Sequence, residues 1–188
     1  MKKQEICAVL CMQSDGGIGK DNKLLYSSRK EIIGDMQRFV NLTTGKVVIM
    51  GRKTWESLPD NFKPLPDRIN IVVSRQPNYQ DKLPSGVMCF DDIGKAITFS
   101  GQAYFEKDIA IIGGAEIYEA TWHLCDTIHT TEVDYKRPAD TFVKLPENLK
   151  EISRERKESE NGIVYHFVDY EVIKNTKPLE LEKYEVSL

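Results

Sequence analysis

Two segments of this chain repeat one pattern: a short run of β-branched residues ends in glycine and continues into a helix-forming stretch. The first is VVIMGRKTWESLP, residues 47–59, and the second is IAIIGGAEIYEA, residues 109–120. A strand that ends in glycine at the start of a helix directs free backbone N–H groups toward whatever lies above the turn, which suits a phosphate. Two such turns in one domain predict a site for a pyrophosphate.

Length and composition agree with a soluble nucleotide-dependent enzyme. The chain has 188 residues and a formal net charge of −3, which indicates one domain with a real core and makes nucleic acid an unexpected main partner. There is no apolar run long enough for a transmembrane helix, so we expect no membrane association. The basic and then apolar N-terminus lacks a cleavage site and is better interpreted as a first strand than as a signal peptide.

The four cysteines are expected to be reduced thiols. They are Cys7, Cys11, Cys89 and Cys125, with no C-x-x-C among them. Cys7 and Cys11 would point the same way on a strand but lie roughly 13 Å apart, at ~3.3 Å per residue, which is too far for a disulfide. We therefore predict a cytoplasmic protein without a metal or redox-cysteine site. The three histidines are scattered and form no constellation.

Strands alternate with short helices along the chain and end in a hairpin, which predicts a mixed sheet flanked by helices. Expected strands cover residues 6–12, 47–50, 69–73, 109–112, 127–133, 149–157 and 162–173. Expected helices cover residues 32–42, 52–58 and 115–122, together with one that Asp91 caps and that runs to about Phe99. Asn161 and Gly162 are a hairpin signal. Residues 1–173 form the expected domain, and the charged residues 174–188 a loosely ordered tail.

Asp35 lies in a stretch whose apolar positions recur at helical spacing. One stripe contains Ile32, Met36, Phe39 and Thr43. Asp35 falls on the flank of this stripe, where a carboxylate must be paired, have a raised pKa or face a ligand. The alternative is that Gly34 and Asp35 form a helix N-cap, with Asp35 only satisfying free N–H groups. Spacing alone leaves both interpretations open.

Two arginines are placed where they could meet phosphates. Arg75 follows Ser74 at the end of a strand, a position that can meet a phosphate carried on a ribose, although an ordinary surface arginine is the commoner case. Arg52 follows Gly51 at a helix start, where its positive charge meets the positive end of the helix dipole. That placement destabilises the helix by about a few tenths of a kcal/mol unless an anion is nearby. Gly113 and Gly114 fit either a phosphate turn or a plain tight turn, and no G-x-G-x-x-G is present.

Taken together, ordered motifs over residues 6–173 make the chain resemble the dihydrofolate reductases. They are A8-V9, I18-G19-K20-D21-N22, V48-I49-M50-G51-R52-K53-T54-W55-E56-S57, P64-L65-P66-x-R68-x-N70, I112-G113-G114-A115-E116-I117-Y118, T130-T131-E132-V133-D134 and D140-T141-F142. The resemblance implies NADPH-dependent reduction of 7,8-dihydrofolate to tetrahydrofolate. It also implies a three-layer α/β/α sandwich around a mixed, mostly parallel sheet of about eight strands.

The resemblance implies that Asp35 is the only acid of the pterin pocket and that Thr131 supports it through a hydroxyl or a water. Tyr26 takes the place of the family's Trp. These three residues form the expected catalytic group. Arg68 would hold the α-carboxylate of the folate tail as a two-pronged pair. The expected substrate-binding residues are Ile6, Ala8, Asp35, Met36, Phe39, Leu65, Arg68, Ile112 and Thr131.

The resemblance likewise implies where NADPH binds. The residues expected around it are Ala8, Ile18, Gly19, Asn22, Leu24, Gly51, Arg52, Lys53, Thr54, Ser74, Arg75, Ile112, Gly113, Gly114, Ala115, Glu116, Ile117 and Tyr118. Among them, Arg52, Ser74 and Arg75 would meet the 2′-phosphate and so favour NADPH over NADH. The Gly113–Gly114 peptide bond is expected to be cis.

One departure from the family pattern affects the acid. The family usually has a Trp-x-x-Pro motif with its acid five residues beyond the Trp, whereas here Tyr26 replaces the Trp, no Pro follows, and the span to Asp35 is about four residues longer. Glu31 fits the five-residue spacing, but the downstream spacing to Phe39, Thr43 and Gly51 assigns the role to Asp35.

Two other functions remain to be separated from this one. A related pyrimidine reductase of riboflavin synthesis shares the fold, although Asp35, Phe39 and Arg68 argue against it. A non-catalytic folate- or nucleotide-binding module is the second. The resemblance further implies a monomer with a small-molecule substrate, open to antifolate inhibitors.

Overall fold

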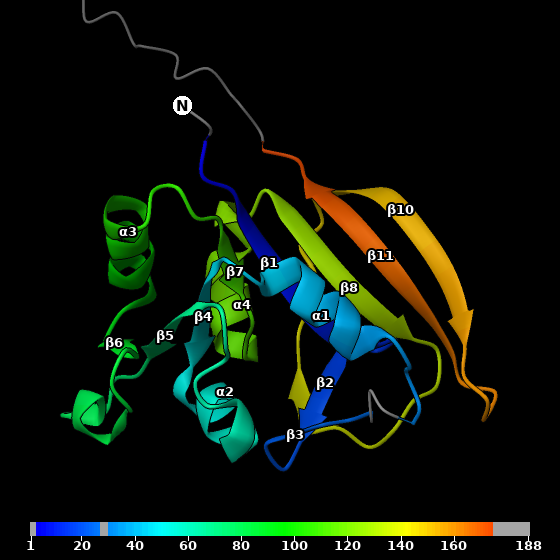
Figure 1. Ribbon diagram of the computed structural model, residues 1–188. Helices are drawn as coiled ribbons and strands as arrows, with labels where there is room; N and C mark the ends of the chain where they lie inside the picture. Colours follow the sequence, from blue (N-terminus) through cyan, green and yellow to red (C-terminus); the bar gives the residue numbers. More distant parts are fainter. Residues whose placement is uncertain (1–2, 27–29, 175–188) are drawn as a thin grey trace, which may run out of the picture.

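The computed structural model describes residues 3–26 and 30–174. Its centre is an eight-stranded sheet in the order β10-β11-β8-β1-β7-β4-β5-β6 (Figure 1). In that order the strands are Leu149–Glu158, Val164–Val172, Thr127–Val133, Ile6–Gln13, Ile109–Ile111, Val47–Gly51, Ile69–Val73 and Met88–Phe90. The strands from β8 to β6 are parallel to their neighbours, and the β10–β11 hairpin joins β8 in antiparallel fashion. The sheet is therefore mixed and mostly parallel, as the resemblance implied.

Helices cover both faces of this sheet. They are α1 (Asp35–Thr43), α2 (Arg52–Ser57), α3 (Ile93–Ala103) and α4 (Ala115–Thr121), with 3-10 turns η1 (Asp60–Phe62), η2 (Tyr79–Lys82) and η3 (Trp122–Leu124). Alternating side chains of a strand point to opposite faces. Ala8 and Leu10 of β1 accordingly join the core beside α3 and α4, whereas Cys7 and Val9 join the core beside α1 and α2. This confirms the three-layer architecture.

A smaller antiparallel sheet lies at the carboxyl end of β1 and was not expected from the sequence. It consists of β2 (Gly17–Lys20), β3 (Lys23–Leu24) and β9 (Thr141–Phe142), in the order β3-β2-β9. Its strands are short and glycine-containing, and β2 pairs with residues more than a hundred positions away. The strand β6 was also missed.

Two helix starts differ from expectation. Helix α1 begins at Asp35 instead of Ile32, because Gly34 adopts the left-handed conformation with φ 93° and no helix can continue through it. Helix α3 is capped by Asp92, whose Oδ1 accepts from the Lys95 amide at 3.0 Å. The prediction of Asp91 as the cap is wrong; Asp91 instead pairs with the Lys95 ammonium.

The expected hairpin at Asn161 and Gly162 is confirmed, since these residues connect β10 to β11 in antiparallel register. The described chain ends just beyond β11, where Lys174 pairs with Asp126 at 2.7 Å. Residues 175–188 of the expected tail lie outside the described residues, so its looseness and the boundary at residue 173 stay predictions.

Candidate active site

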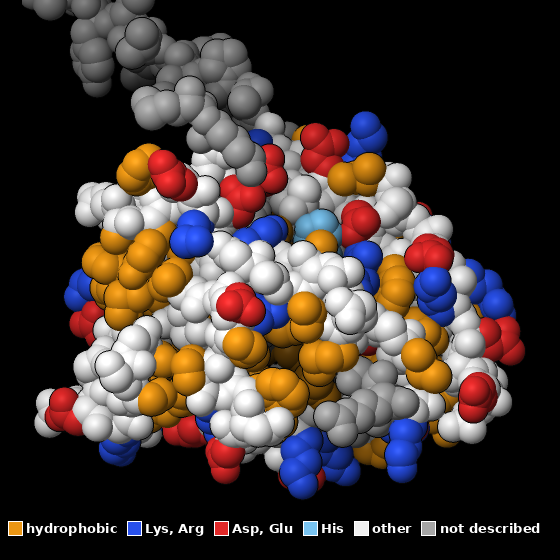
Figure 2. All heavy atoms as spheres, in the orientation of Figure 1, with side chains coloured by type: hydrophobic (Ala, Val, Ile, Leu, Met, Phe, Trp, Pro, Cys, Tyr) orange, Lys and Arg blue, Asp and Glu red, His pale blue; other side chains and the backbone are white. Residues whose placement is uncertain are grey.

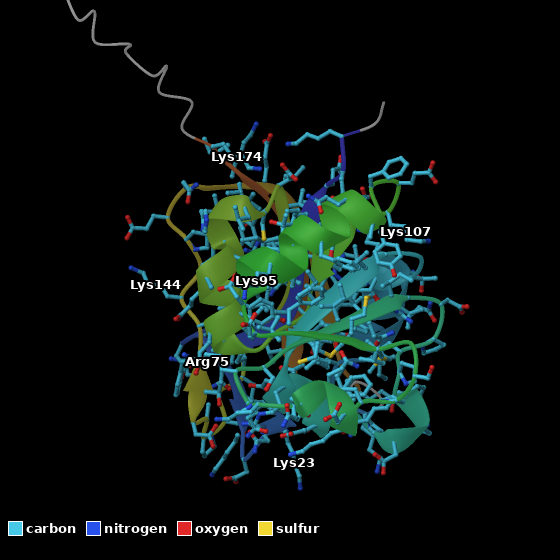
Figure 3. The ribbon with its side chains drawn as sticks, turned by 90° about the vertical axis from the view of Figure 1, so that its left-hand side faces the viewer. Lys23, Arg75, Lys95, Lys107, Lys144 and Lys174 are labelled. Carbon is cyan, nitrogen blue, oxygen red and sulfur yellow. The ribbon has the colours of Figure 1, made fainter. Side chains whose placement is uncertain are left out.

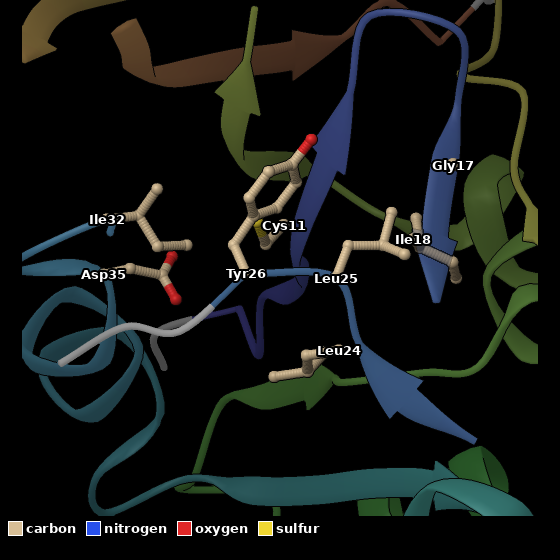
Figure 4. Close-up of a pocket in the computed structure, with 8 residues that line it drawn as sticks. All are labelled: Cys11, Gly17, Ile18, Leu24, Leu25, Tyr26, Ile32 and Asp35. Atoms are coloured by element: carbon tan, nitrogen blue, oxygen red, sulfur yellow. The ribbon is translucent and has the colours of Figure 1, made fainter. Parts of the chain in front are cut away.

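A pocket opens at the carboxyl end of β1, between α1 and the small sheet. It encloses about 240 Å³ of empty space, part of it open to solvent. Figure 2 shows a hollow on this face, ringed by hydrophobic side chains. Its lining comprises Cys11, Gly17, Ile18, Leu24, Leu25, Tyr26, Ile32 and Asp35 (Figure 4). Among the described residues, the lining therefore contains one carboxylate in otherwise mostly apolar surroundings.

Asp35 is the first residue of α1, and its side chain points into the pocket (Figure 4). Gly34 is the N-cap, and no side chain makes a cap hydrogen bond at this helix start. The Asp35 carboxylate instead accepts from the hydroxyl of Thr131, which is 2% exposed. Burial raises the pKa of Asp35, while the Thr131 hydrogen bond and the nearby positive charge of Arg38 partly offset that rise. The geometry thus favours a ligand-facing acid over a helix cap.

Tyr26 contributes its ring to the pocket and turns its hydroxyl away from Asp35 (Figure 4). That hydroxyl donates to Gln13 Oε1 at 2.8 Å and also contacts the Tyr135 carbonyl. The guanidinium of Arg137 packs on the outer face of the ring, 4.9 Å from its centroid. The hydroxyl of Tyr26, expected in the catalytic group, is therefore engaged in structural contacts, and its ring is what faces the pocket.

Glu31, the competing acid, faces a different partner. It forms a two-pronged ion pair with Arg137, in which Nη1 lies 3.2 Å from Oε2. Arg137 also donates to the Leu25 carbonyl at 2.9 Å. Glu31 does not line the pocket, so the structure places Asp35 there, as the downstream spacing indicated.

Residues expected around the rest of the substrate lie along α1 and the loop before β5. Phe39 and Leu65 pack in the core beside α1, and Met36 is 48% exposed. Arg68 donates from Nε to Thr43 Oγ1 at 2.9 Å and from Nη1 to the Pro66 carbonyl at 2.5 Å. Its third nitrogen, Nη2, is buried and has no hydrogen-bond partner among the described residues. A buried donor without a partner is costly and marks a place for an acceptor.

Ile6 and Ala8 do not line this pocket, and their expected contacts with the ligands stay predictions. Ile6 begins β1, and its amide and carbonyl are engaged by Asp126. It is five residues, roughly 16 Å at ~3.3 Å per residue, from Cys11. Ala8 is fully buried on the opposite face of the sheet, beside α3 and α4. Cys11, three residues further along β1, lines the pocket in their place.

The two strand–glycine–helix turns meet one another. The Gly51 amide donates to the Gly113 carbonyl at 2.7 Å. The Gly113–Gly114 peptide bond is cis, as the resemblance implied. A Cβ atom at either glycine would come within 3.4 Å of Thr54 Oγ1, and Gly113 has φ +114°. The φ of Gly113 is one that residues with a side chain rarely adopt, so glycine suits this position. Ile112 lies just before it, buried, with its amide bonded to the Ile49 carbonyl at 3.0 Å.

The expected phosphate-binding cations lie near these turns, each paired with an acid. Arg52 Nη1 lies 2.8 Å from Glu56 Oε2. Arg75 Nη2 lies 3.6 Å from Glu116 Oε2, and both side chains are more than 80% exposed. Arg75 lies on the side of the molecule that carries α3 (Figure 3). The surface ion pairs are worth at most about 1 kcal/mol, so an incoming phosphate can replace the carboxylates.

The remaining expected cofactor residues lie in four places. Ile18 and Leu24 line the pocket, and Gly19 and Asn22 lie in the same β2–β3 hairpin. The residues of the two helix starts are Lys53, Ala115 and Ile117. Ser74 is nearly buried after β5 and accepts from the Gln76 amide at 3.2 Å. Tyr118 has a structural role, because its hydroxyl donates to the Val9 carbonyl at 2.7 Å and its ring stacks on Trp122.

Sequence reasoning missed four residues that line the pocket: Cys11, Gly17, Leu25 and Ile32. Alternation along β1 from Cys7 and Val9 to Cys11 could have found the first. The others depend on how the segments before α1 pack, which no local pattern shows. Among the described residues, no group of three or more acids, histidines or cysteines could hold a metal ion. No described helix combines the length and the apolar character needed to cross a membrane.

Comparison with known proteins shows the family to which the chain is similar. Residues 5–172 match the dihydrofolate reductase family. The chain is 36% identical over 166 residues to the type 8 dihydrofolate reductase of Escherichia coli, covering 86% of this chain and 90% of that protein. It is 40% identical over 141 residues to the dihydrofolate reductase of Neisseria gonorrhoeae, covering 72% and 81%. The bifunctional dihydrofolate reductase-thymidylate synthase of Paramecium tetraurelia is 35% identical over 165 residues, and the chain spans 33% of its length.

Proposed function

This chain belongs to the dihydrofolate reductase family, and on that premise we propose how its pocket reduces 7,8-dihydrofolate to 5,6,7,8-tetrahydrofolate with NADPH. The observation that carries the proposal is Asp35, the pocket's carboxylate, held by Thr131 in largely apolar surroundings. A carboxylate that has lost solvent in this way is stabilised when a cationic or hydrogen-bond-donating ligand binds to it.

Asp35 binds the pterin through its amino group and the adjacent ring nitrogen, which together present two donors to the two carboxylate oxygens. This fixes the ring in one orientation against the apolar lining. The negative charge of Asp35 also favours the protonated pterin, in which N5 carries the added proton. Thr131 stabilises the charged carboxylate by donating its hydroxyl hydrogen.

The folate tail runs from this pocket past Phe39 and Leu65 to Arg68. The support is the buried Nη2 of Arg68, which has no partner among the described residues. A tail carboxylate supplies the acceptor that Nη2 lacks, and guanidinium geometry suits a two-pronged pair with it. Arg68 therefore binds substrate at a distance from the reacting carbon.

The residues present fit NADPH. The paired turns at Gly51 and Gly113–Gly114 carry no side chains, and an added Cβ atom at Gly51 would meet Ile117 at 3.3 Å, so backbone can approach a pyrophosphate closely. We propose that Arg52, Ser74 and Arg75 bind the 2′-phosphate on the adenosine ribose, and the two arginines are free to do so because their ion pairs with Glu56 and Glu116 are weak surface pairs. When bound, NADPH supplies the hydride that the pterin C6 accepts. Ile18 and Leu24 exclude water beside the reacting atoms.

We propose that the enzyme works as a monomer in the cytoplasm. The four cysteines are unpaired, which suits a reducing compartment. The net charge of −3 argues against nucleic acid as a partner.

The test is a spectrophotometric assay of NADPH oxidation with dihydrofolate, run on the unmodified chain, on Asp35→Asn and on Glu31→Gln. Asp35→Asn keeps the shape and one acceptor but removes the charge, so we expect turnover at pH 7 to fall by about 100-fold or more. Activity should partly return on acidification, because solvent then protonates the substrate directly.

Glu31→Gln is the matched control, because it neutralises the neighbouring acid that faces Arg137. Its turnover should stay close to that of the unmodified chain. NADPH binding by Asp35→Asn, measured by calorimetry, should be unchanged. A chain that binds both ligands without turnover would instead be a non-catalytic module. Loss of turnover in Glu31→Gln alone would transfer the catalytic role to Glu31.

A further inference from the structure

A half-buried polar cluster lies beneath α1, one turn beyond the pocket acid. Asp169 of β11 is its centre. Arg38 Nη2 and His129 Nδ1 each lie 2.6 Å from Asp169 Oδ1, and Ser153 donates to Asp169 Oδ2 at 2.8 Å. His129 Nδ1 must therefore carry its proton. Apolar residues would fill this space more cheaply, since burying charged groups is seldom a net gain in stability.

The cluster holds the guanidinium of Arg38 in one place. Besides its pair with Asp169, Arg38 donates to the Val168 carbonyl at 3.3 Å. Its guanidinium carbon also lies 4.9 Å above the centroid of the Phe167 ring. Only 19% of the Arg38 side chain is exposed. An arginine fixed from three sides presents its charge at a defined position, unlike a solvated surface arginine.

That position is next to Asp35. Arg38 follows Asp35 by three residues on α1, so the two side chains are neighbours on the helix surface. The other groups that interact with the Asp35 charge are Cys11 of β1, Tyr118 of α4 and Tyr165 of β11. Burial raises the pKa of each of these three, so they are neutral across the physiological range. Within the described part of the chain, Arg38 is the charged member of this set.

His129 adds no second positive charge at neutral pH. Burial lowers its pKa, and Arg38 and Lys46 act in the same direction, whereas Asp169 opposes them. A neutral His129 donates to Asp169 and orients that carboxylate toward Arg38. Asp169 remains ionised, because its partners lower its pKa despite burial.

We propose that Arg38 is a positioning residue for dihydrofolate reduction: Asp169, His129 and Phe167 fix its guanidinium beside Asp35, so that its positive charge favours the carboxylate form that binds the pterin. The inference rests on the proposed function, because it matters for catalysis only if Asp35 binds the pterin. The ionisation of Asp35 itself can nevertheless be measured without substrate.

The experiment is a carboxyl ¹³C NMR titration of the ligand-free protein labelled at aspartate. The Asp35 resonance is identified by its loss in Asp35→Asn. We expect Arg38→Gln to raise the apparent pKa of Asp35 by about 0.5 to 1 pH unit, and Arg38→Lys to restore most of the difference. The acidic limb of the pH profile of kcat/KM for dihydrofolate should move by the same amount.

Arg154→Gln is the matched control. Arg154 also pairs with two carboxylates, Glu132 and Glu151, but on the outer strand β10 and away from the pocket. It should leave the Asp35 titration unchanged. An unshifted titration in Arg38→Gln, or equal shifts in the Gln and Lys variants of Arg38, would overturn the proposal. Failure of Asp35→Asn to lose turnover would instead refute the proposed function and leave the titration result standing.

Discussion

Arg68 offers the sharpest separation of binding from chemistry. In the free protein its Nε and Nη1 are bonded to Thr43 and Pro66, and its Nη2 is buried without a partner. A tail carboxylate that reaches Nη2 forms a charge-assisted bond and ends the cost of an unpaired buried donor. Such bonds contribute about 2–3 kcal/mol. At 1.4 kcal/mol for each factor of ten, their loss corresponds to about 30- to 150-fold in affinity.

We therefore expect Arg68→Leu to raise the KM for dihydrofolate by about 30- to 150-fold while changing kcat little. Steady-state assays at pH 7 measure both constants. Arg68→Lys keeps the positive charge but lacks the planar guanidinium, so its KM for dihydrofolate should lie between those of the unmodified protein and Arg68→Leu.

Protein stability provides an independent check on the same variant. Burial already lowers the pKa of Arg68, so removal of its charge relieves desolvation while losing the Thr43 hydrogen bond. These opposing effects should leave the free energy of unfolding within about 1 kcal/mol of the original.

A tail-less dihydropterin should bind equally well to the unmodified protein and to Arg68→Leu. If that compound loses affinity as strongly as dihydrofolate, Arg68 shapes the pocket and does not hold the tail, and the reasoning fails.

Two further predictions concern the cofactor and acid stability. Arg75→Ala should weaken NADPH by about 10- to 100-fold and leave NADH nearly unchanged, as measured by calorimetry; equal losses would show that Arg75 does not meet the 2′-phosphate. Although burial opposes it, hydrogen bonds from Lys174, the Ile6 amide and Lys3 lower the pKa of Asp126 to about 2. Its stabilisation is therefore complete above the unfolded pKa near 3.8 and is lost as pH falls toward 2. Asp126→Asn should lower Tm at pH 6 but not at pH 2, and equal losses at both would contradict this.

The sequence predicts the sheet well where the strands are buried and β-branched. Residues 47–50 and 69–73 form strands as expected, because strands covered on both faces are continuous apolar runs. Edge and small-sheet strands carry no such signal, and β2 depends on pairing with the distant Phe142. Asp91 and Asp92 both suit an N-cap by type, and only the backbone conformation distinguishes them.

The candidate site divides in the same way. Asp35, Arg68 and the glycine turns were located by motifs whose chemistry is local. The roles of Ile6 and Ala8 were implied by the resemblance, and neither residue lines the pocket. A strand's alternation gives the face on which a residue lies, whereas its distance from the pocket depends on how the following loop folds. The sequence could not predict the polar cluster around Arg38, because that cluster also depends on contacts between distant segments. Its partners His129 and Asp169 come from two strands that are far apart in sequence and meet only through the β8–β11 register.

The contacts on either side of the longer segment before Asp35 have a consequence for how this chain can change over evolution. Upstream, the Tyr26 hydroxyl is bound by Gln13 and by the Tyr135 carbonyl. Downstream, Tyr165 donates to the Ile33 carbonyl. Doubling the length of a flexible loop between two fixed points costs only about 0.6 kcal/mol. A change in length between these two anchors therefore costs little where it leaves the Glu31–Arg137 ion pair and the buried Ile32 in place, and the acid then stays in register with Thr131.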